Sequence, residues 1–229
     1  MPDETHLKAI EYIKSHKKEL IERFANGSIC PTEKYPISIF MAGSPGAGKT
    51  EFSKNFITKF KMQAVRIDAD EIKDFLPHYN KMNSSEVQGA SALGVEYLHD
   101  FALKAAKSMV LDGTFAHHDK AHENIARSLR KNRHTEIYYV YQDPFVAWNF
   151  TKAREALEGR RVPKEVFIEA LFSAKQNVNR IKLDFRNRIQ INVVLKNLEN
   201  NLDKAYFDVD SVDHYVTITH GKDSLLAKL

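Results

Sequence analysis

The sequence of 229 residues contains little cysteine and no long apolar run. Its single cysteine, Cys30, excludes an internal disulfide framework and is typical of proteins from reducing compartments. No stretch approaches the roughly 18–20 apolar residues of a membrane-spanning helix, and the opening MPDETHLKAIEYIKSHKKEL is charged rather than typical of a signal peptide. These features lead us to expect a cytoplasmic protein that does not associate with membranes.

A strong excess of one charge sign is also missing. The chain carries 34 Lys and Arg residues against 30 Asp and Glu residues, a formal net charge of +4. This balance is compatible with an anionic small-molecule substrate, and it is too weak to indicate binding to nucleic acid. We therefore do not expect a nucleic-acid partner.

Short apolar runs alternate with amphipathic stretches along the chain. The apolar runs predict strands at 37–42, 63–70, 108–114 and 135–142, with later strands at 188–195 and 214–219. Helical periodicity covers 6–24, 50–61, 93–107, 119–130, 144–158 and 163–181. Strands that alternate with helices predict an α/β fold with a parallel sheet flanked by helices. Since no repeat or linker interrupts the pattern, we expect one domain over 1–229, with an N-terminal helical extension at 1–33.

Glycine is scarce as well, yet three of the nine glycines fall between residues 43 and 48. Together with Lys49 and Thr50 they match the phosphate-loop pattern G-x-x-x-x-G-K-[ST], and a predicted strand precedes the loop while a helix follows it. The alternative is a strand-to-helix turn that merely needs flexible residues. The agreement of pattern and context favours a phosphate loop.

The residue types of this loop suit a bound triphosphate. Glycines let backbone N–H groups converge on a phosphate, and the following helix N-terminus adds unpaired donors. Lys49 can reach the β- and γ-phosphates, and the Thr50 hydroxyl can hold Mg²⁺. We expect ATP with Mg²⁺ as the bound cofactors. The predicted ATP-binding residues are Gly43, Ser44, Pro45, Gly46, Ala47, Gly48, Lys49 and Thr50.

Acidic residues follow the second and third predicted strands. Asp112 comes after the apolar run of the third strand, where an acid holds Mg²⁺ directly or through water. Asp68 and Asp70 end the second strand, and an ionised carboxylate there can accept a proton from a substrate hydroxyl. The alternative for either aspartate is a helix N-cap, and at Asp70 capping and catalysis are compatible.

A cationic segment, KAREALEGRRVPKE, follows the fourth predicted strand. It offers Lys152, Arg154, Arg160 and Arg161 around Gly159, and mobile arginines can neutralise a transferring phosphoryl group. We therefore predict that 144–182 forms a lid and the helix that follows it. Arg161 could replace Arg160, and the alternative for the whole segment is a solvated basic helix end.

Five stretches in order carry a resemblance to a known family: GSPGAGKT, RIDADEIKDFLPHY, the helix with Glu96, VLDGTFA and KAREALEGRRVPKEVF. The chain resembles the zeta toxin family, the toxin halves of epsilon/zeta-type toxin–antitoxin systems. The resemblance implies a nucleotide-kinase-like P-loop fold and an ATP-dependent kinase. It implies UDP-N-acetylglucosamine as substrate, phosphorylated on the 3′-hydroxyl of its amino-sugar, and an antitoxin protein as a partner.

The resemblance also implies roles for individual residues. Asp70 falls on the catalytic base, and Glu96 and Thr114 fall on substrate-contacting positions. Arg154 and Arg160 fall on two lid arginines. The chain departs from the family in having DGT where EGT is common, and His117-His118 near the place of a frequent arginine.

Two other functions remain open from the sequence. One is a P-loop kinase of a different hydroxyl, such as a nucleoside or a polynucleotide 5′-end. The other is a nucleotide-binding switch without kinase activity, whose ATP turnover would not respond to acceptor sugars.

Overall fold

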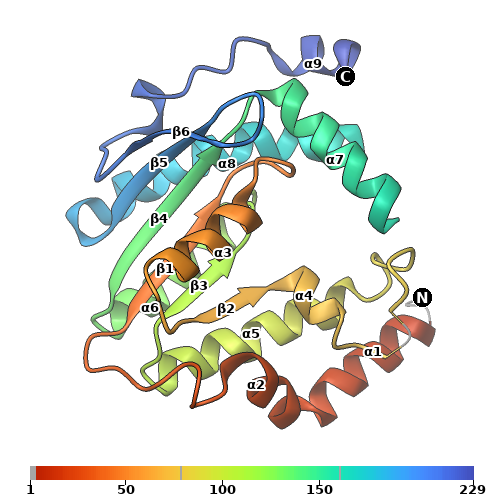
Figure 1. Ribbon diagram of the computed structural model, residues 1–229, viewed down its shortest axis with the longest axis vertical. Helices are drawn as coiled ribbons and strands as arrows, with labels where there is room; N and C mark the ends of the chain where they lie inside the picture. The colour runs from red at the N-terminus through yellow and green to blue at the C-terminus, as the bar shows by residue number, and fades with distance from the viewer. Residues whose placement is uncertain (1–3, 78, 160) are drawn as a thin grey trace.

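A twisted sheet forms the centre of the computed structural model, which describes residues 4–77, 79–159 and 161–229 (Figure 1). Within these residues the sheet has six strands in the order β2-β3-β1-β4-β5-β6. The first five strands are parallel, and β6 pairs antiparallel with β5. The strands are β1 (Ile37–Ala42), β2 (Val65–Asp68), β3 (Met109–Asp112), β4 (His134–Tyr141), β5 (Gln190–Lys196) and β6 (Leu202–Tyr206). The predicted α/β fold is confirmed.

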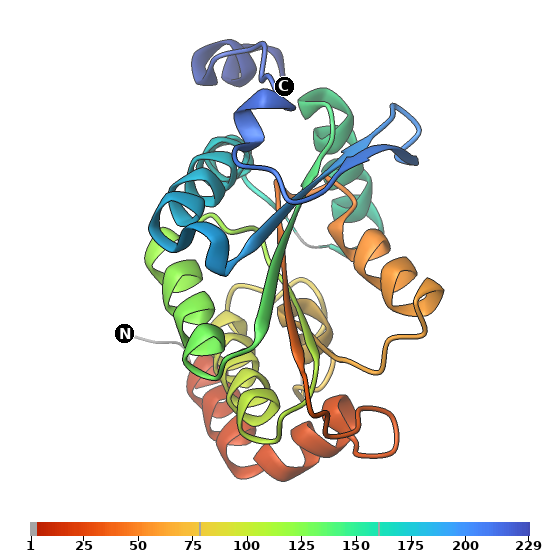
Figure 2. The ribbon, with the colours of Figure 1, turned by 90° about the vertical axis from the view of Figure 1, so that its left-hand side faces the viewer.

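Helices cover both faces of the sheet (Figure 2). One face is covered by α5, α6 and α8, and the other by α3, while α7 extends beyond the carboxyl ends of the strands. The helices are α1 (Glu4–Ser15), α2 (Lys17–Ala25), α3 (Lys49–Lys59), α4 (Ala69–Lys73), α5 (Gln88–Lys104), α6 (His118–Arg130), α7 (Pro144–Glu158), α8 (Lys164–Phe185) and α9 (Lys222–Lys228). Short 3₁₀ turns occur at Arg186–Arg188 and Val212–His214. No helix within the described ranges is long and apolar enough to cross a bilayer.

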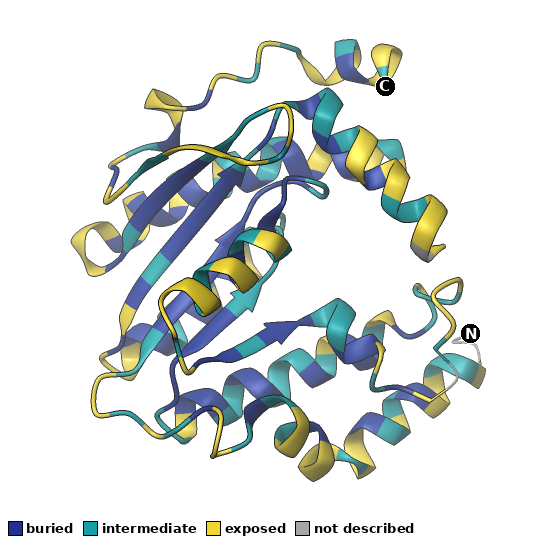
Figure 3. Cartoon of the chain, in the orientation of Figure 1, coloured by how far each residue is buried: buried dark blue, intermediate teal, exposed yellow. Residues whose placement is uncertain are grey.

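Strand β1 shows how the apolar pattern builds the core. Its side chains alternate, so that Phe40 packs with the helices of the α5 face while Ile39 and Met41 pack with Phe52 of α3. All but the first residue of β1 are buried, as Figure 3 shows for the central strands. A strand buried on both faces must be apolar throughout, which is why 37–42 reads as a continuous run.

The predicted N-terminal helix is divided into α1 and α2 at His16. Both helices pack against α5, and Ile13 and Leu20 are fully buried there. The N-terminal extension is therefore part of the main hydrophobic cluster.

The prediction of a last strand at 214–219 is wrong. The chain instead forms β6 at Leu202–Tyr206, and residues 216–219 have no regular structure. Val216 is buried and its carbonyl accepts a hydrogen bond from Lys175 Nζ of α8, at 2.6 Å. The apolar residues of this segment thus pack over α8, and their alternation does not reflect strand pairing.

Candidate functional site

The loop between β1 and α3 has the geometry of a phosphate-binding loop. Gly43 and Gly46 have φ of +135° and +70°, and a Cβ at Gly46 would lie 2.0 Å from the Ala147 carbonyl oxygen. Only glycine fits such positions. Lys49 lies across the loop, and its Nζ donates to the carbonyl oxygens of Gly43, at 3.0 Å, and Ser44, at 2.7 Å. These contacts hold the Lys49 amine beside the place where the loop would bind a phosphate.

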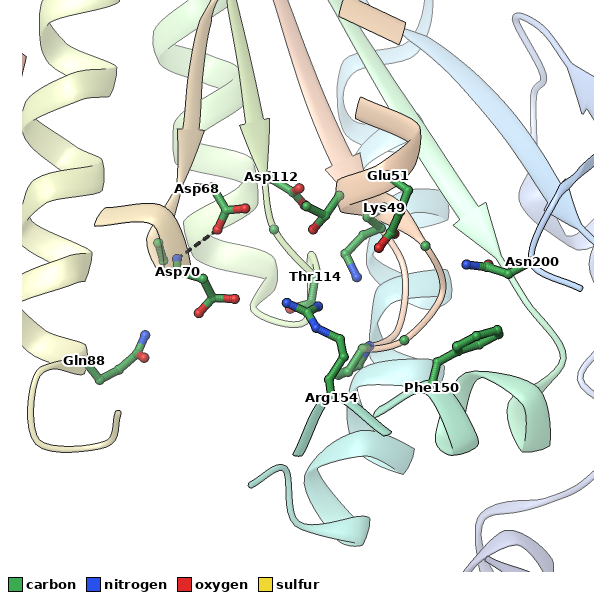
Figure 4. A pocket seen from close by; sticks show the side chains of 16 residues that line it. Lys49, Glu51, Asp68, Asp70, Gln88, Asp112, Thr114, Phe150, Arg154 and Asn200 are labelled. Carbon is green, nitrogen blue, oxygen red and sulfur yellow. Dashed lines mark hydrogen bonds between the residues drawn. The ribbon is translucent and has the colours of Figure 1, made fainter. Parts of the chain in front are cut away.

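A cavity of about 400 Å³ opens beside this loop at the carboxyl ends of β1, β2 and β3 (Figure 4). Parallel sheets present their ligand sites at this edge. The lining residues come from the loop, the strand ends, α3, α4, α5, α7 and the turn between β5 and β6. They are Pro45, Gly46, Gly48, Lys49, Thr50, Glu51, Asp68, Ala69, Asp70, Gln88, Asp112, Gly113, Thr114, Phe150, Arg154 and Asn200.

Asp112 ends β3 beside the first turn of α3. Its side chain is 5% exposed, and its Oδ2 accepts a hydrogen bond from Arg66 Nη2 at 2.7 Å. Burial raises the pKa of the Asp112 carboxyl, helped by the charge of Asp68, while Lys49 and Arg66 oppose that rise. The Thr50 hydroxyl and the Asp112 carboxylate line the same cavity, and both are hard oxygen donors of the kind that Mg²⁺ takes together with phosphates. Thr50 and Asp112 therefore fit the magnesium site predicted for them.

Arg66 of β2 was not among the predicted site residues. Its Nη2 lies 2.7 Å from an oxygen of Asp68 and 2.7 Å from an oxygen of Asp112, and its Nη1 lies 2.5 Å from Glu71. One guanidinium thus holds together the acids that end two neighbouring strands. The signal was a charged residue between two buried ones, Val65 and Ile67, two positions before an acid.

Asp68 and Asp70 have different environments. The Asp68 carboxylate caps α4, where its Oδ1 accepts from the backbone N–H of Asp70 at 2.8 Å. The Asp70 side chain is 38% exposed and points into the cavity (Figure 4). The buried amine of Lys73 lies 3.4 Å from Asp70 Oδ1 and donates to Ser84 Oγ at 2.7 Å. Of the two acids, Asp70 is the one placed to meet a substrate.

Thr114 and Glu96, the two predicted substrate contacts, lie in different places. Thr114 lines the cavity, and its carbonyl oxygen accepts the N–H of Gly43 at 3.2 Å. Glu96 is not among the described residues that line the cavity. Its carboxylate pairs with Lys120 and Arg127 of α6, the latter at 2.9 Å. Helical spacing located Glu96 on α5 but could not tell which neighbour it faces, and its role toward substrate stays a prediction.

Of the two predicted lid arginines, the structure describes Arg154. Arg154 of α7 lines the cavity and extends toward the loop and Thr114 (Figure 4). Arg160, the second predicted lid arginine, lies outside the described residues. Six further lining residues were not predicted. Nothing in their local sequence distinguishes Glu51, Gln88, Phe150 and Asn200 from surface residues, and Ala69 and Gly113 are neighbours of predicted acids.

Comparisons with known proteins show which family the sequence matches. The model of a family described as "Zeta toxin" matches residues 21–207. Toxin PezT of Streptococcus pneumoniae serotype 4 is 34% identical over 79 residues, which cover 34% of this chain and 30% of that toxin. This match thus spans less than a third of the relative's length.

Solved structures share the fold. The structure of the PezAT chromosomal toxin–antitoxin system of Streptococcus pneumoniae aligns with a TM-score of 0.65 at 16% identity, covering 98% of this chain and 88% of the other. The AvrRxo1-ORF1:-ORF2 complex with ATP aligns with a TM-score of 0.62 at 14% identity, covering 94% and 71% of the two chains. At these identities the likeness concerns the fold.

Proposed function

Because the chain belongs to the zeta toxin family, we propose that it is an ATP-dependent phosphotransferase that acts on the hydroxyl of a small molecule. One observation carries the proposal. A single cavity is lined by a phosphate loop with its lysine, by the Thr50 and Asp112 oxygens, and by an aspartate on the opposite wall. Phosphoryl transfer needs these three groups around the γ-phosphate.

The phosphate loop would hold the triphosphate. Its backbone N–H groups and the N-terminus of α3 would surround the β-phosphate. Lys49 would exchange its bonds to the Gly43 and Ser44 carbonyls for bonds to phosphate oxygens. Thr50 and Asp112 would hold Mg²⁺, which when bound neutralises charge on the phosphates. Arg154 would approach the same oxygens from α7.

Asp70 would act on the acceptor. Its carboxylate would accept the proton of the attacking hydroxyl while the new O–P bond forms and the bond from the γ-phosphorus to the ADP oxygen breaks. Asp68 supports this role by capping α4, since that bond fixes the backbone that carries Asp70. Lys73 lies 3.4 Å from Asp70 Oδ1, and this contact helps to orient the Asp70 side chain.

The acceptor that we propose is the 3′-hydroxyl of the amino-sugar of UDP-N-acetylglucosamine or a related sugar nucleotide. The family membership supports this choice, and Thr114 and Gln88 offer polar groups near Asp70. We further propose an antitoxin partner, because the structural relative from Streptococcus pneumoniae is a toxin–antitoxin system.

The test is an acceptor panel. The purified protein is incubated with ATP, Mg²⁺ and either UDP-N-acetylglucosamine, free sugars, nucleosides or a 5′-hydroxyl oligonucleotide, and mass spectrometry detects added phosphate. We expect phosphate on UDP-N-acetylglucosamine, loss of it with Lys49→Ala, and retention with Lys59→Ala at an exposed site on the same helix. Transfer to another acceptor would refute the sugar nucleotide. ATP turnover that ignores every acceptor would favour a switch.

A growth assay tests the toxin role separately. We expect expression in a bacterium to inhibit growth, and Lys49→Ala or Asp70→Ala to relieve the inhibition. If both variants inhibit as strongly as the parent, catalysis is not the cause of toxicity.

A further inference from the structure

The cavity has two ends, and the proposed reaction decides which end takes the nucleoside. This inference rests on the proposed function. The attacking hydroxyl and Asp70 must lie beside the γ-phosphate, so the nucleoside must extend from the other side of the phosphate loop. Figure 4 shows Asp70 and Gln88 on one side of Lys49, and Asn200 and Phe150 on the other.

Asn200 is presented by a structured turn between β5 and β6. The Asn197 side chain accepts the N–H groups of Glu199, at 3.1 Å, and Asn201, at 2.8 Å. The buried Gln142 at the end of β4 donates to the Asn197 carbonyl at 2.7 Å. Asn200 itself has φ of +63°, a conformation that persists because these bonds determine the turn. The turn therefore holds Asn200 in place before any ligand binds.

The amide of Asn200 lies directly over the phosphate loop. A Cβ on Gly48 would lie 2.7 Å from Asn200 Oδ1 and 3.2 Å from its Nδ2. The Asn200 amide oxygen is buried and accepts no hydrogen bond from any described residue. Buried polar atoms are normally paired, so this oxygen lacks a donor at the edge of a ligand cavity.

Phe150 supplies an apolar surface at the same end. It lies on α7, is 36% exposed and lines the cavity. Aromatic rings stack on nucleobases regardless of the base, because every base has a π-face. An aromatic ring and an amide oxygen without a donor, at the same end of the cavity, are the two components of base recognition.

We propose that Phe150 and Asn200 bind the nucleobase, and that the Asn200 amide oxygen accepts the exocyclic amino group of adenine. An asparagine amide pairs with adenine because it offers an acceptor beside a donor. Hypoxanthine, the base of ITP, and guanine carry a carbonyl oxygen at that position, which would face the amide oxygen without a hydrogen bond when the amide keeps its orientation in the structure. The site thus selects ATP over ITP and GTP.

The experiment measures the affinities of Mg-ATP and Mg-ITP for the full chain by calorimetry. We expect ATP to bind about tenfold more tightly, as befits one hydrogen bond. Asn200→Gly keeps the positive φ accessible, and it should lower the affinity for ATP to the affinity that the parent has for ITP. Asn200→Asp keeps an acceptor and should retain the preference. Phe150→Ala should lower the affinities for ATP and ITP by the same factor.

The matched control is Asn201→Ala, on the same turn and outside the cavity lining, which should bind like the parent. Equal binding of ATP and ITP by the parent, or a preference that survives Asn200→Gly, would overturn the inference. The inference would also be overturned if 2′-deoxy-ATP, and not ITP, bound more weakly than ATP and Asn200→Gly removed that difference. Asn200 would then accept its hydrogen bond from the ribose hydroxyl. A parent that binds no nucleotide at all would refute the proposed function itself.

Discussion

Two aspartates separated by one residue illustrate how strongly local environment divides chemical roles. Asp68 is 7% exposed, and its carboxylate is used by the α4 backbone and by Arg66. Asp70 is the second residue of α4, the helix that this bond caps, and its side chain reaches the cavity. Asp68 therefore fixes the backbone from which the Asp70 carboxylate projects into the cavity.

Asp70→Asn should reduce phosphate transfer by about 10²–10⁴-fold, the usual contribution of a general base. Nucleotide affinity should change little, because the proposed phosphate contacts come from the loop. Asp74→Asn, an exposed aspartate at the end of the same helix, is the matched control and should retain activity. Single-turnover assays and calorimetry measure the two quantities. Retained transfer in Asp70→Asn would remove Asp70 from the chemistry.

His99 is a buried titratable group that the proposed reaction does not use. It is fully buried on α5, and neither ring nitrogen has a hydrogen-bond partner among the described residues. Burial, with help from the charge of Arg127, lowers the pKa of His99 from 6.5 to about 3. Below about pH 6.5 the unfolded chain binds a proton that the native state excludes, so stability falls as pH falls.

His99→Leu should remove this loss of stability at low pH. The difference in unfolding free energy between the variant and the parent should therefore grow by about 2 kcal/mol as the pH falls from 7 to 5, since the penalty in the parent grows by up to about 1.4 kcal/mol per pH unit. Urea denaturation at both pH values measures the difference. The same replacement at the exposed His214 should leave the parent's pH dependence in place, and a parallel response of both variants would count against the burial argument.

At the scale of elements, helices α1 and α2 show amphipathic packing without a role in the site. Their apolar stripes meet α5, with Leu20 fully buried, while Leu7 is 56% exposed. Helix α5, whose first residue Gln88 lines the cavity, is thereby packed between the sheet and the N-terminal helices. The N-terminal segment contributes to stability through this face.

Leu20→Ala should lower the free energy of unfolding by about 3 kcal/mol, because it removes buried methyl groups and leaves a cavity. Leu7→Ala on the neighbouring helix should change it by less than about 0.5 kcal/mol. Urea titrations measure both. Similar losses in the two variants would show that burial on α5 is not what stabilises these helices.

At the scale of the whole molecule, the site joins segments far apart in the chain. The loop follows β1, Asp70 follows β2, Thr114 follows β3, Arg154 lies on α7 and Asn200 follows β5. A ligand that contacts all of them stabilises only the folded arrangement.

Mg-ATP at about 100 times its dissociation constant should therefore raise the melting temperature by about 5–10 °C. Lys49→Ala should lose most of this rise, because the proposed phosphate contact is gone. Differential scanning fluorimetry with and without nucleotide measures the shift. A similar rise in Lys49→Ala would mean that ATP binds elsewhere.

The predictable part of this protein is what depends on neighbours in sequence. The phosphate loop was readable because its glycines, Lys49 and Thr50 must stand at fixed offsets for the loop to turn. The central strands were readable because burial on both faces demands continuous apolar residues. The membership of the zeta toxin family followed from such motifs in order.

Tertiary structure alone decided which side chains meet across those elements. Arg66 joins two strand ends, Glu96 pairs with α6 instead of lining the cavity, and Asn200 reaches Gly48 from a turn about 150 positions away. Spacing along a helix or strand determines which residues share a face, but not what that face touches. The contacts of that face depend on sheet order and helix packing, which are set by the burial of the whole core.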